Sequence, residues 1–132
     1  MESLIQAARE AREKAYAPYS GFKVGAAVLS RDGRIFSGCN VENASYGLTN
    51  CAERTAVFKA VSEGGTQLTA LAVIADTRKP VAPCGACRQV MAEFGIEKII
   101  MCNTKGERHI ATLDQLLPAV FNQHDLTGDD KF

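Results

Sequence analysis

The feature that most constrains the fold is a nearly unbroken apolar run, Leu68–Ala75, which reads Leu-Thr-Ala-Leu-Ala-Val-Ile-Ala. An apolar run of this length without polar alternation is typical of a strand that is covered on both faces. We predict a second buried strand at Ile96–Cys102. The helical pattern between the two, Cys84–Phe94, is stopped by Gly95. Buried strands separated by helices predict a sheet with helices on both faces.

The remaining elements complete an α/β fold. Helical spacing of apolar residues predicts a first helix from about Leu4 that Pro18 ends, and a second helix over Cys51–Glu63. Short turns at 31–33 and 103–106 require the strands that flank them to pair antiparallel. Those flanking strands are predicted at Phe22–Ser30, Arg34–Asn40, Ile96–Cys102 and Glu107–Ala111. A capping box that starts at Thr112 opens a final helix.

These elements predict a three-layer α-β-α sandwich around a mixed five-stranded sheet whose last two strands are antiparallel. A length of 132 residues suits one domain with one core, so we expect a single domain over 1–132. The segment after about residue 122 is polar, and we expect it to be loosely packed.

Charge and composition narrow the possible partners. Fifteen Lys and Arg balance fifteen Asp and Glu, and no basic run is visible, which argues against nucleic acid as a partner. No apolar stretch approaches the roughly 20 residues of a membrane span, and the N-terminus has no signal-peptide pattern. The chain contains five Cys, an odd number, which favours free thiols in a reducing compartment. We therefore expect a cytoplasmic protein without a membrane partner.

Three cysteines have the spacing of a metal site. Cys51 opens one predicted helix, and Cys84 and Cys87 lie in the first turn of another, just after Pro83. A helix N-terminus favours negative charge and lowers a thiol pKa, so these cysteines are suited to act as thiolate ligands. Three protein ligands leave the fourth tetrahedral position of a zinc ion open, which is typical of a catalytic zinc.

The residues that follow these cysteines add chemistry to the site. Glu53 could move protons at a water in the open position, although it could instead cap its own helix. Three thiolates and Zn²⁺ carry one net negative charge, which should weaken the ion as a Lewis acid. Arg54 and Arg88 are candidates to donate to a thiolate and offset that charge, with exposed helix arginines as the alternative.

Two other interpretations of the cysteines remain open. Cys84-x-x-Cys87 alone could form a redox pair, which would not use Cys51 or Glu53. A structural zinc would need a fourth ligand, and the only other Cys and His are Cys39, Cys102, His109 and His124. None of these four has metal-ligand spacing to the others, and the two cysteines end apolar strands where core thiols are common.

With these residues, the sequence resembles the zinc-dependent nucleoside and nucleotide deaminases. It is most similar to the small, homotetrameric cytidine deaminases, from about residue 17 to about residue 121. The motifs that carry the resemblance are Tyr19-Ser20, Phe22-Lys23-Val24-Gly25-Ala26, Gly38-Cys39-Asn40-Val41-Glu42-Asn43, Asn50-Cys51-Ala52-Glu53-Arg54 and Pro83-Cys84-Gly85-Ala86-Cys87.

The resemblance implies a role for each matching residue. Cys51, Cys84 and Cys87 would bind one Zn²⁺ per subunit. Glu53 would carry protons from zinc-bound water to N3 of cytosine and to the leaving amine. Phe22 would pack on the nucleoside, and Asn40 and Glu42 would bind the ribose hydroxyls. Backbone groups near Ala52 would recognise the base. The aromatic residues Tyr46 and Phe121 would also approach the substrate, in part from a neighbouring subunit.

From the residues alone, several of these contacts have plainer alternatives. Asn40 and Glu42 could form a solvated strand edge, although their spacing places both on one face. Phe22 and Phe121 would more often be core or interface residues.

Two features favour a free nucleoside as the substrate. The first metal ligand is Cys51, where the resembling deaminases of nucleotides and nucleic acids have His. The link between the last two strands is too short for a parallel pair, whereas a helix intervenes in the polynucleotide enzymes. The expected activity is deamination of cytidine and 2′-deoxycytidine in pyrimidine salvage. The alternatives are deamination of a nucleoside-like antibiotic and a noncatalytic zinc or redox module.

Overall fold

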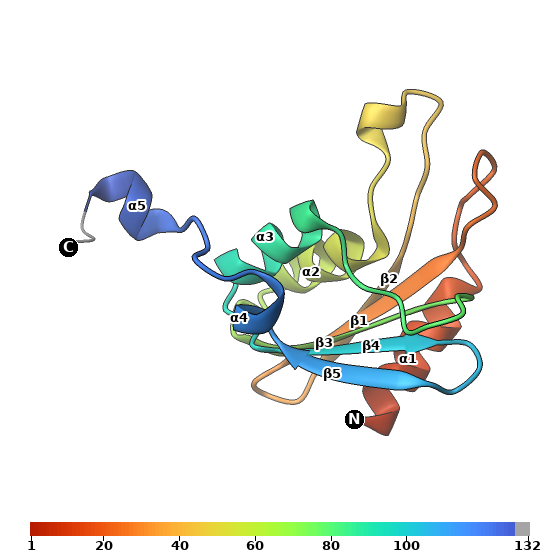
Figure 1. Cartoon of the computed structure of the whole chain (residues 1–132), viewed down its shortest axis with the longest axis horizontal. Helices are drawn as coiled ribbons and strands as arrows, with labels where there is room; N and C mark the ends of the chain where they lie inside the picture. The colour runs from red at the N-terminus through yellow and green to blue at the C-terminus, as the bar shows by residue number, and fades with distance from the viewer. Residues whose placement is uncertain (129–132) are drawn as a thin grey trace.

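The computed structural model describes residues 1–128 and shows one mixed sheet between two layers of helices (Figure 1). The strand order in the sheet is β2-β1-β3-β4-β5. The strands are β1 (Val24–Ser30), β2 (Ile35–Cys39), β3 (Leu68–Ala75), β4 (Lys98–Asn103) and β5 (Arg108–Thr112). The helices are α1 (Glu2–Arg12), the 3-10 helix η1 (Tyr46–Leu48), α2 (Ala52–Ser62), α3 (Gly85–Glu93), α4 (Leu113–Leu116) and α5 (Gln123–Thr127).

The strand directions confirm the predicted mixed sheet. The pairs β1–β2, β1–β3 and β4–β5 are antiparallel, and β3–β4 is parallel. A parallel pair needs a long crossover, and here α3 lies on that crossover. The last two strands are joined by a tight turn and are antiparallel, as the spacing at 103–106 predicted.

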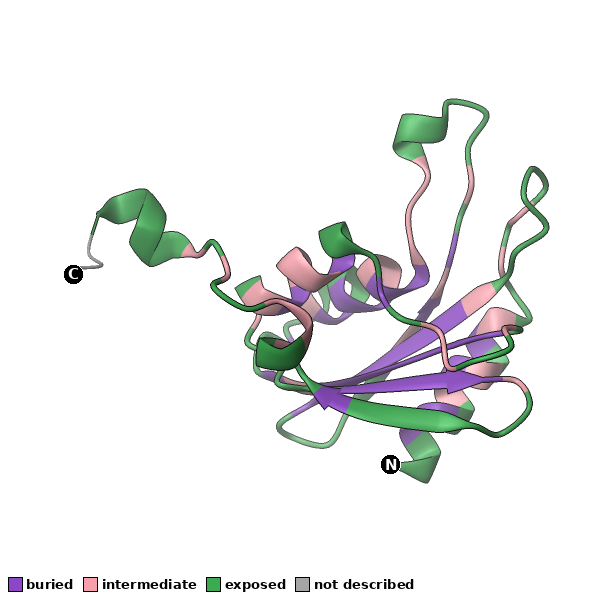
Figure 2. Cartoon of the chain, in the orientation of Figure 1, coloured by how far each residue is buried: buried purple, intermediate pink, exposed green. Residues whose placement is uncertain are grey.

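Two apolar clusters, one on each face of the sheet, form the core that Figure 2 shows in purple. Alternate residues of β3 divide between them, because successive side chains of a strand point to opposite faces. Leu71 and Val73 pack with α2 and α3, whereas Ala72 and Ile74 pack with α1. This accounts for the nearly unbroken apolar run in β3.

Two glycines allow helices to approach the sheet closely. A Cβ atom at Gly25 would lie 2.0 Å from the carbonyl oxygen of Ala8 in α1. A Cβ atom at Gly38 would lie 2.5 Å from the backbone nitrogen of Ala56 in α2. Any side chain at either position would therefore push a helix away from its strand.

The first predicted helix is too long. It ends at Arg12 rather than near Pro18, and Glu13, Lys14 and Ala15 then form turns with the residues three positions earlier. The cause is long-range, because the backbone N–H of Tyr16 donates to the carbonyl of Asn40 at 3.0 Å. This pairing takes the chain out of the helix.

The C-terminal part of the described chain consists of two short helices. Thr112 and Gln115 form the predicted capping box, but α4 spans only four residues. The second, α5, was not predicted, and its own capping box joins Asn122 and Asp125. Among residues 1–128, no helix is both long enough and apolar enough to cross a membrane.

Candidate active site

The three predicted metal ligands come together where α2 and α3 begin. Cys51 is the N-cap of α2, Cys84 is the N-cap of α3, and Cys87 lies in the first turn of α3. Their sulfur atoms all lie within 4.8 Å of one another. The Cys51–Cys84 distance is 3.8 Å and the Cys84–Cys87 distance is 3.5 Å. Tetrahedral zinc with Zn–S bonds of about 2.3 Å requires sulfur atoms about 3.8 Å apart, so the cluster fits this ion.

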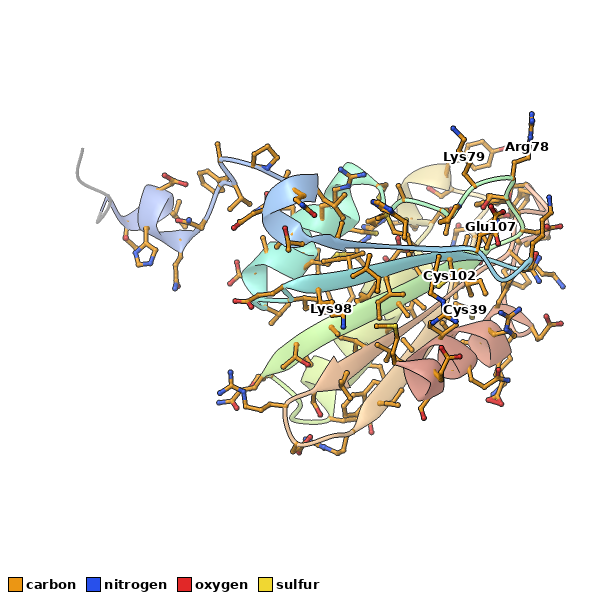
Figure 3. The ribbon with its side chains drawn as sticks, turned by 60° about the horizontal axis from the view of Figure 1, so that its bottom comes forward. Cys39, Arg78, Lys79, Lys98, Cys102 and Glu107 are labelled. Carbon is orange, nitrogen blue, oxygen red and sulfur yellow. The ribbon has the colours of Figure 1, made fainter. Side chains whose placement is uncertain are left out.

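No fourth Cys or His joins the cluster among the residues that the structure describes. Cys102 lies in β4 and packs in the core cluster under α1, and Cys39 ends β2 (Figure 3). His109 lies in β5 and His124 in α5. The arrangement therefore fits a zinc site with an open position and does not fit a closed four-ligand site.

Interactions among the thiols shift the pKa values of Cys51 and Cys87 in opposite directions. The pKa of Cys51 is lowered to about 5, chiefly by the hydrogen bond that it accepts from Cys87, with Arg54 as a further donor. The same hydrogen bond raises the pKa of Cys87. The cluster is thus prepared to present at least one thiolate near neutral pH.

The two candidate arginines behave differently. Nη2 of Arg54 donates to Sγ of Cys51 at 3.3 Å. Arg88 does not reach a thiol, since its Nε donates to the carbonyl of Pro83 at 2.8 Å and its Nη1 to the carbonyl of Leu116 at 2.7 Å. The interpretation of Arg88 as a partner of the cluster was therefore wrong, because the residue instead ties the start of α3 to α4.

Glu53 is buried beside the thiols, with 5% of its surface exposed. The pKa of Glu53 is raised to about 7, chiefly by burial and also by the nearby charge of Cys51, against a hydrogen bond from its own backbone N–H and the charge of Arg54. The capping box considered for residues 50–53 is absent, since no side-chain hydrogen bond caps α2 and Asn50 donates to Thr55 instead, although the Glu53 carboxyl group does accept from its own backbone N–H. A buried carboxyl group that titrates near neutral pH is suited to general acid–base chemistry.

A cavity of about 200 Å³ opens onto the cluster and contains several of the predicted residues. Phe22, Asn40, Ala52 and Glu53 line it together with Cys51 and Cys84. The other lining residues were not predicted from the sequence to lie at the site, and they are Val24, Thr49, Asn50, Val81 and Ala82. Val81 and Ala82 lie in the loop between β3 and α3. The only sequence signal for them was that this loop follows the carboxyl end of a buried strand, where ligands often bind in α/β proteins.

Asn40 is buried, lines this cavity and binds the backbone of two other residues that line it. Its Nδ2 donates to the carbonyl of Phe22 at 2.7 Å, and its Oδ1 accepts from the N–H of Val24 at 2.9 Å. Phe22 is 44% exposed, so it is not a core residue. Each polar atom of the Asn40 amide retains further hydrogen-bonding capacity for a ligand.

Glu42 and Tyr46 line an adjacent cavity of about 370 Å³ with Tyr19, Ser20 and Thr49. Thr49 borders both cavities. The rings of Tyr19 and Tyr46 meet edge to face, with centroids 6.2 Å apart. The structure thus places Glu42 and Tyr46 next to the cysteine cavity but not in it.

Phe121 lies apart from the cysteine cavity. It is 59% exposed and borders a third cavity with Glu93 and His124. Gln89 of α3 donates to the Phe121 carbonyl at 2.7 Å. Within this chain, Phe121 is not among the residues that line the cavity at the thiols.

Comparison with known proteins gives consistent matches. The model of the cytidine and deoxycytidylate deaminase zinc-binding region matches residues 1–103. A cytidine deaminase of Sporosarcina psychrophila is 55% identical over 129 residues, which cover 96% of this chain and 95% of that protein.

Solved structures match over similar spans. The crystal structure of a cytidine deaminase from Burkholderia pseudomallei has a TM-score of 0.88 and 54% identity, covering 91% of this chain and 98% of that one. The corresponding structure from Mycobacterium tuberculosis has a TM-score of 0.78 and 44% identity, covering 91% and 95%. The sequence match, the shared fold and the three-cysteine cluster agree that this chain belongs to the cytidine and deoxycytidylate deaminase family.

Proposed function

We propose that this protein hydrolyses cytidine and 2′-deoxycytidine to uridine and 2′-deoxyuridine with release of ammonia, a reaction of pyrimidine salvage. The observation that carries the proposal is a buried carboxyl group, Glu53, in one cavity with the thiols of Cys51 and Cys84. Relatives and solved structures named cytidine deaminase, at up to 55% identity, support the same substrate class.

The zinc ligands and Glu53 have different roles in the proposed reaction. Cys51, Cys84 and Cys87 would hold a zinc ion, which would supply Lewis acidity and an activated water as the nucleophile for hydrolysis. Glu53 takes a proton from the attacking water and delivers it to N3 of the cytosine ring as the new C4–O bond forms. It then takes the second proton from the hydroxyl group at C4 and delivers it to the amine, which leaves as ammonia when the C4–N bond breaks. Because burial places its pKa at about 7, Glu53 can both accept and donate a proton near neutral pH.

The other residues bind and orient the nucleoside. Phe22 packs on it from the cavity wall, and the backbone at Ala52 reads the base where α2 begins. Asn40 and Glu42 hold the ribose hydroxyls, and Tyr46 approaches from the adjacent cavity. The short link between β4 and β5 and the use of Cys51 rather than His support a free nucleoside rather than a polynucleotide.

The assembly and the metal content are part of the proposal. We expect one Zn²⁺ per subunit and a homotetramer whose active sites lie near the interfaces, with Phe121 reaching the site of a neighbouring subunit. Placement in the cytoplasm stays a prediction. Gel filtration tests the assembly, and metal analysis tests the stoichiometry.

The decisive test is the loss of cytidine absorbance with purified protein and with Glu53→Gln. We expect an active wild type that contains zinc and a Glu53→Gln variant that binds zinc but loses activity by more than about a hundredfold, as the loss of a general acid–base requires. Glu63→Gln, in an exposed position where α2 ends, is the matched control and should remain active. An active Glu53→Gln protein would contradict the mechanism, and wild type that acts only on another aminopyrimidine nucleoside would contradict the substrate.

A further inference from the structure

The hydroxyl group of Ser20 lies between two residues that the proposed function places on the nucleoside. It donates to Oε2 of Glu42 and accepts from the backbone N–H of Phe22 at 3.0 Å. Ser20 itself is exposed and does not line the cavity at the thiols. Its position thus connects the two cavities through hydrogen bonds.

Residues 19 and 20 hold the carboxylate of Glu42 from one side. Besides the Ser20 hydroxyl, the backbone N–H groups of Tyr19 and Ser20 donate to Oε1 at 2.9 and 3.1 Å. Both oxygen atoms of Glu42 are therefore held by donors. These bonds, the Ser20 hydroxyl first, keep the pKa of Glu42 below its usual range, so the group is an ionised acceptor at neutral pH.

Phe22 depends less on Ser20 than Glu42 does. Its carbonyl oxygen is held by Nδ2 of Asn40 at 2.7 Å, and the N–H of Val24 donates to Oδ1 of the same amide. Loss of the Ser20 hydroxyl would leave these two bonds in place. The same loss would remove the donor to Oε2 of Glu42, so the carboxylate would be held through Oε1 alone and its orientation would be less fixed.

We propose that Ser20 is a positioning residue that orients the Glu42 carboxylate toward a hydroxyl of the ribose. The inference rests on the proposed function, in which Glu42 contacts the sugar. It extends that function by assigning the Tyr19-Ser20 turn to sugar recognition. Ser20 touches neither the base nor the thiols, so it affects binding of the sugar rather than the chemical step.

The test compares Ser20→Ala, Ser20→Thr and the control Ser62→Ala, whose hydroxyl donates to the Lys59 carbonyl at the far end of α2. For Ser20→Ala we expect KM for cytidine to rise about tenfold with kcat within about twofold, the size of effect of one charge-assisted hydrogen bond. Ser20→Thr keeps the hydroxyl at an exposed position and should restore KM. The inhibition constant of 2′,3′-dideoxycytidine should stay the same in all three variants, because it lacks the 2′- and 3′-hydroxyls that Glu42 would contact.

A second arm places Ser20→Ala in a Glu42→Gln background, where it should have no further effect on KM. An equal rise for cytidine and for the dideoxy analogue, or an unchanged KM in Ser20→Ala, would overturn the proposal, as would an additive double variant. Each of these outcomes leaves wild-type deamination of cytidine intact. Failure of the wild type itself would instead overturn the proposed function, so the two failures are distinguishable.

Discussion

At the scale of single residues, we predict that Arg54 offsets the charge of the zinc-loaded cysteine cluster. Three thiolates around Zn²⁺ leave one net negative charge, and the Arg54 guanidinium lies 3.3 Å from Cys51 Sγ. Its buried Nε has no hydrogen-bond partner among the residues that the structure describes. Burying an unpaired donor costs about 1–3 kcal/mol, a cost that the predicted interaction of the positive charge with the thiolates would help to offset.

Arg54→Gln should lower kcat about tenfold while the zinc content stays at the wild-type level. The thiolates would then donate more charge to the metal and make it a weaker Lewis acid, and changes in such outer partners typically cost 10- to 100-fold. Steady-state kinetics and metal analysis on the same samples measure both quantities.

Arg31→Gln, in the exposed turn between β1 and β2, is the control for losing one positive charge elsewhere. If Arg54→Gln retained the full kcat, the charge of Arg54 would not assist the reaction. Loss of zinc instead of kcat would show that Arg54 mainly holds the ligands.

At the scale of elements, the site depends on two helix starts that meet on one face of the sheet. Cys51 begins α2 and Cys84 begins α3, and the core cluster between these helices and the sheet fixes their relative positions. The close approach of α2 to β2 at Gly38 sets how deep Cys51 and Glu53 lie. Packing of α2 is therefore part of the geometry of the metal site.

Gly38→Ala should lower the free energy of unfolding by about 3 kcal/mol, because the new methyl group would meet backbone and Thr55 side-chain atoms that cannot easily move. Denaturant unfolding of the zinc-loaded protein measures this change. A displaced α2 should also weaken zinc binding, which a chelator competition would detect.

Gly47→Ala is the matched control, since a Cβ atom there meets nothing within 4 Å and the residue has no positive φ. It should unfold within about 0.5 kcal/mol of the wild type, as ordinary surface substitutions do. If Gly38→Ala were as stable as this control, the contact between α2 and β2 would not be tight.

At the scale of the whole molecule, local signals were enough to predict the sheet and the metal cluster. Turns at 31–33 and 103–106 predicted two antiparallel pairs, and the nearly unbroken apolar run of β3 indicated a strand covered on both faces. The spacing Cys84-x-x-Cys87 after Pro83 placed two thiols at one helix start. Each of these signals lies within a few residues of the structure that it predicts.

Features that depend on distant partners could not be predicted in this way. The first helix ends early because Tyr16 pairs with the backbone of Asn40. Arg88 turns away from the thiols because the carbonyl of Leu116, 28 residues along the chain, accepts its hydrogen bond. Neither acceptor is marked by any local pattern, so sequence reasoning had no signal for them.

The role of Phe121 also depends on a distant partner, in this case one on another subunit of the proposed tetramer. The segment that leads from α4 to α5 extends away from the sheet in Figure 1. Phe121 is 59% exposed, and Leu126 in α5 is 77% exposed. In the proposed tetramer this segment would lie against a neighbouring subunit, and Phe121 would serve the neighbour's active site rather than its own.

This assignment predicts complementation between two defective variants. Phe121→Ala should raise KM for cytidine at unchanged oligomeric mass, and Glu53→Gln should be inactive. When the two are unfolded together and refolded into mixed assemblies, a Glu53→Gln subunit can supply Phe121 to a site that retains Glu53. The KM of such sites should return toward the wild-type value, which kinetics of the mixture would show. A mixture whose kinetics match Phe121→Ala alone would mean that Phe121 acts within its own chain or not at all.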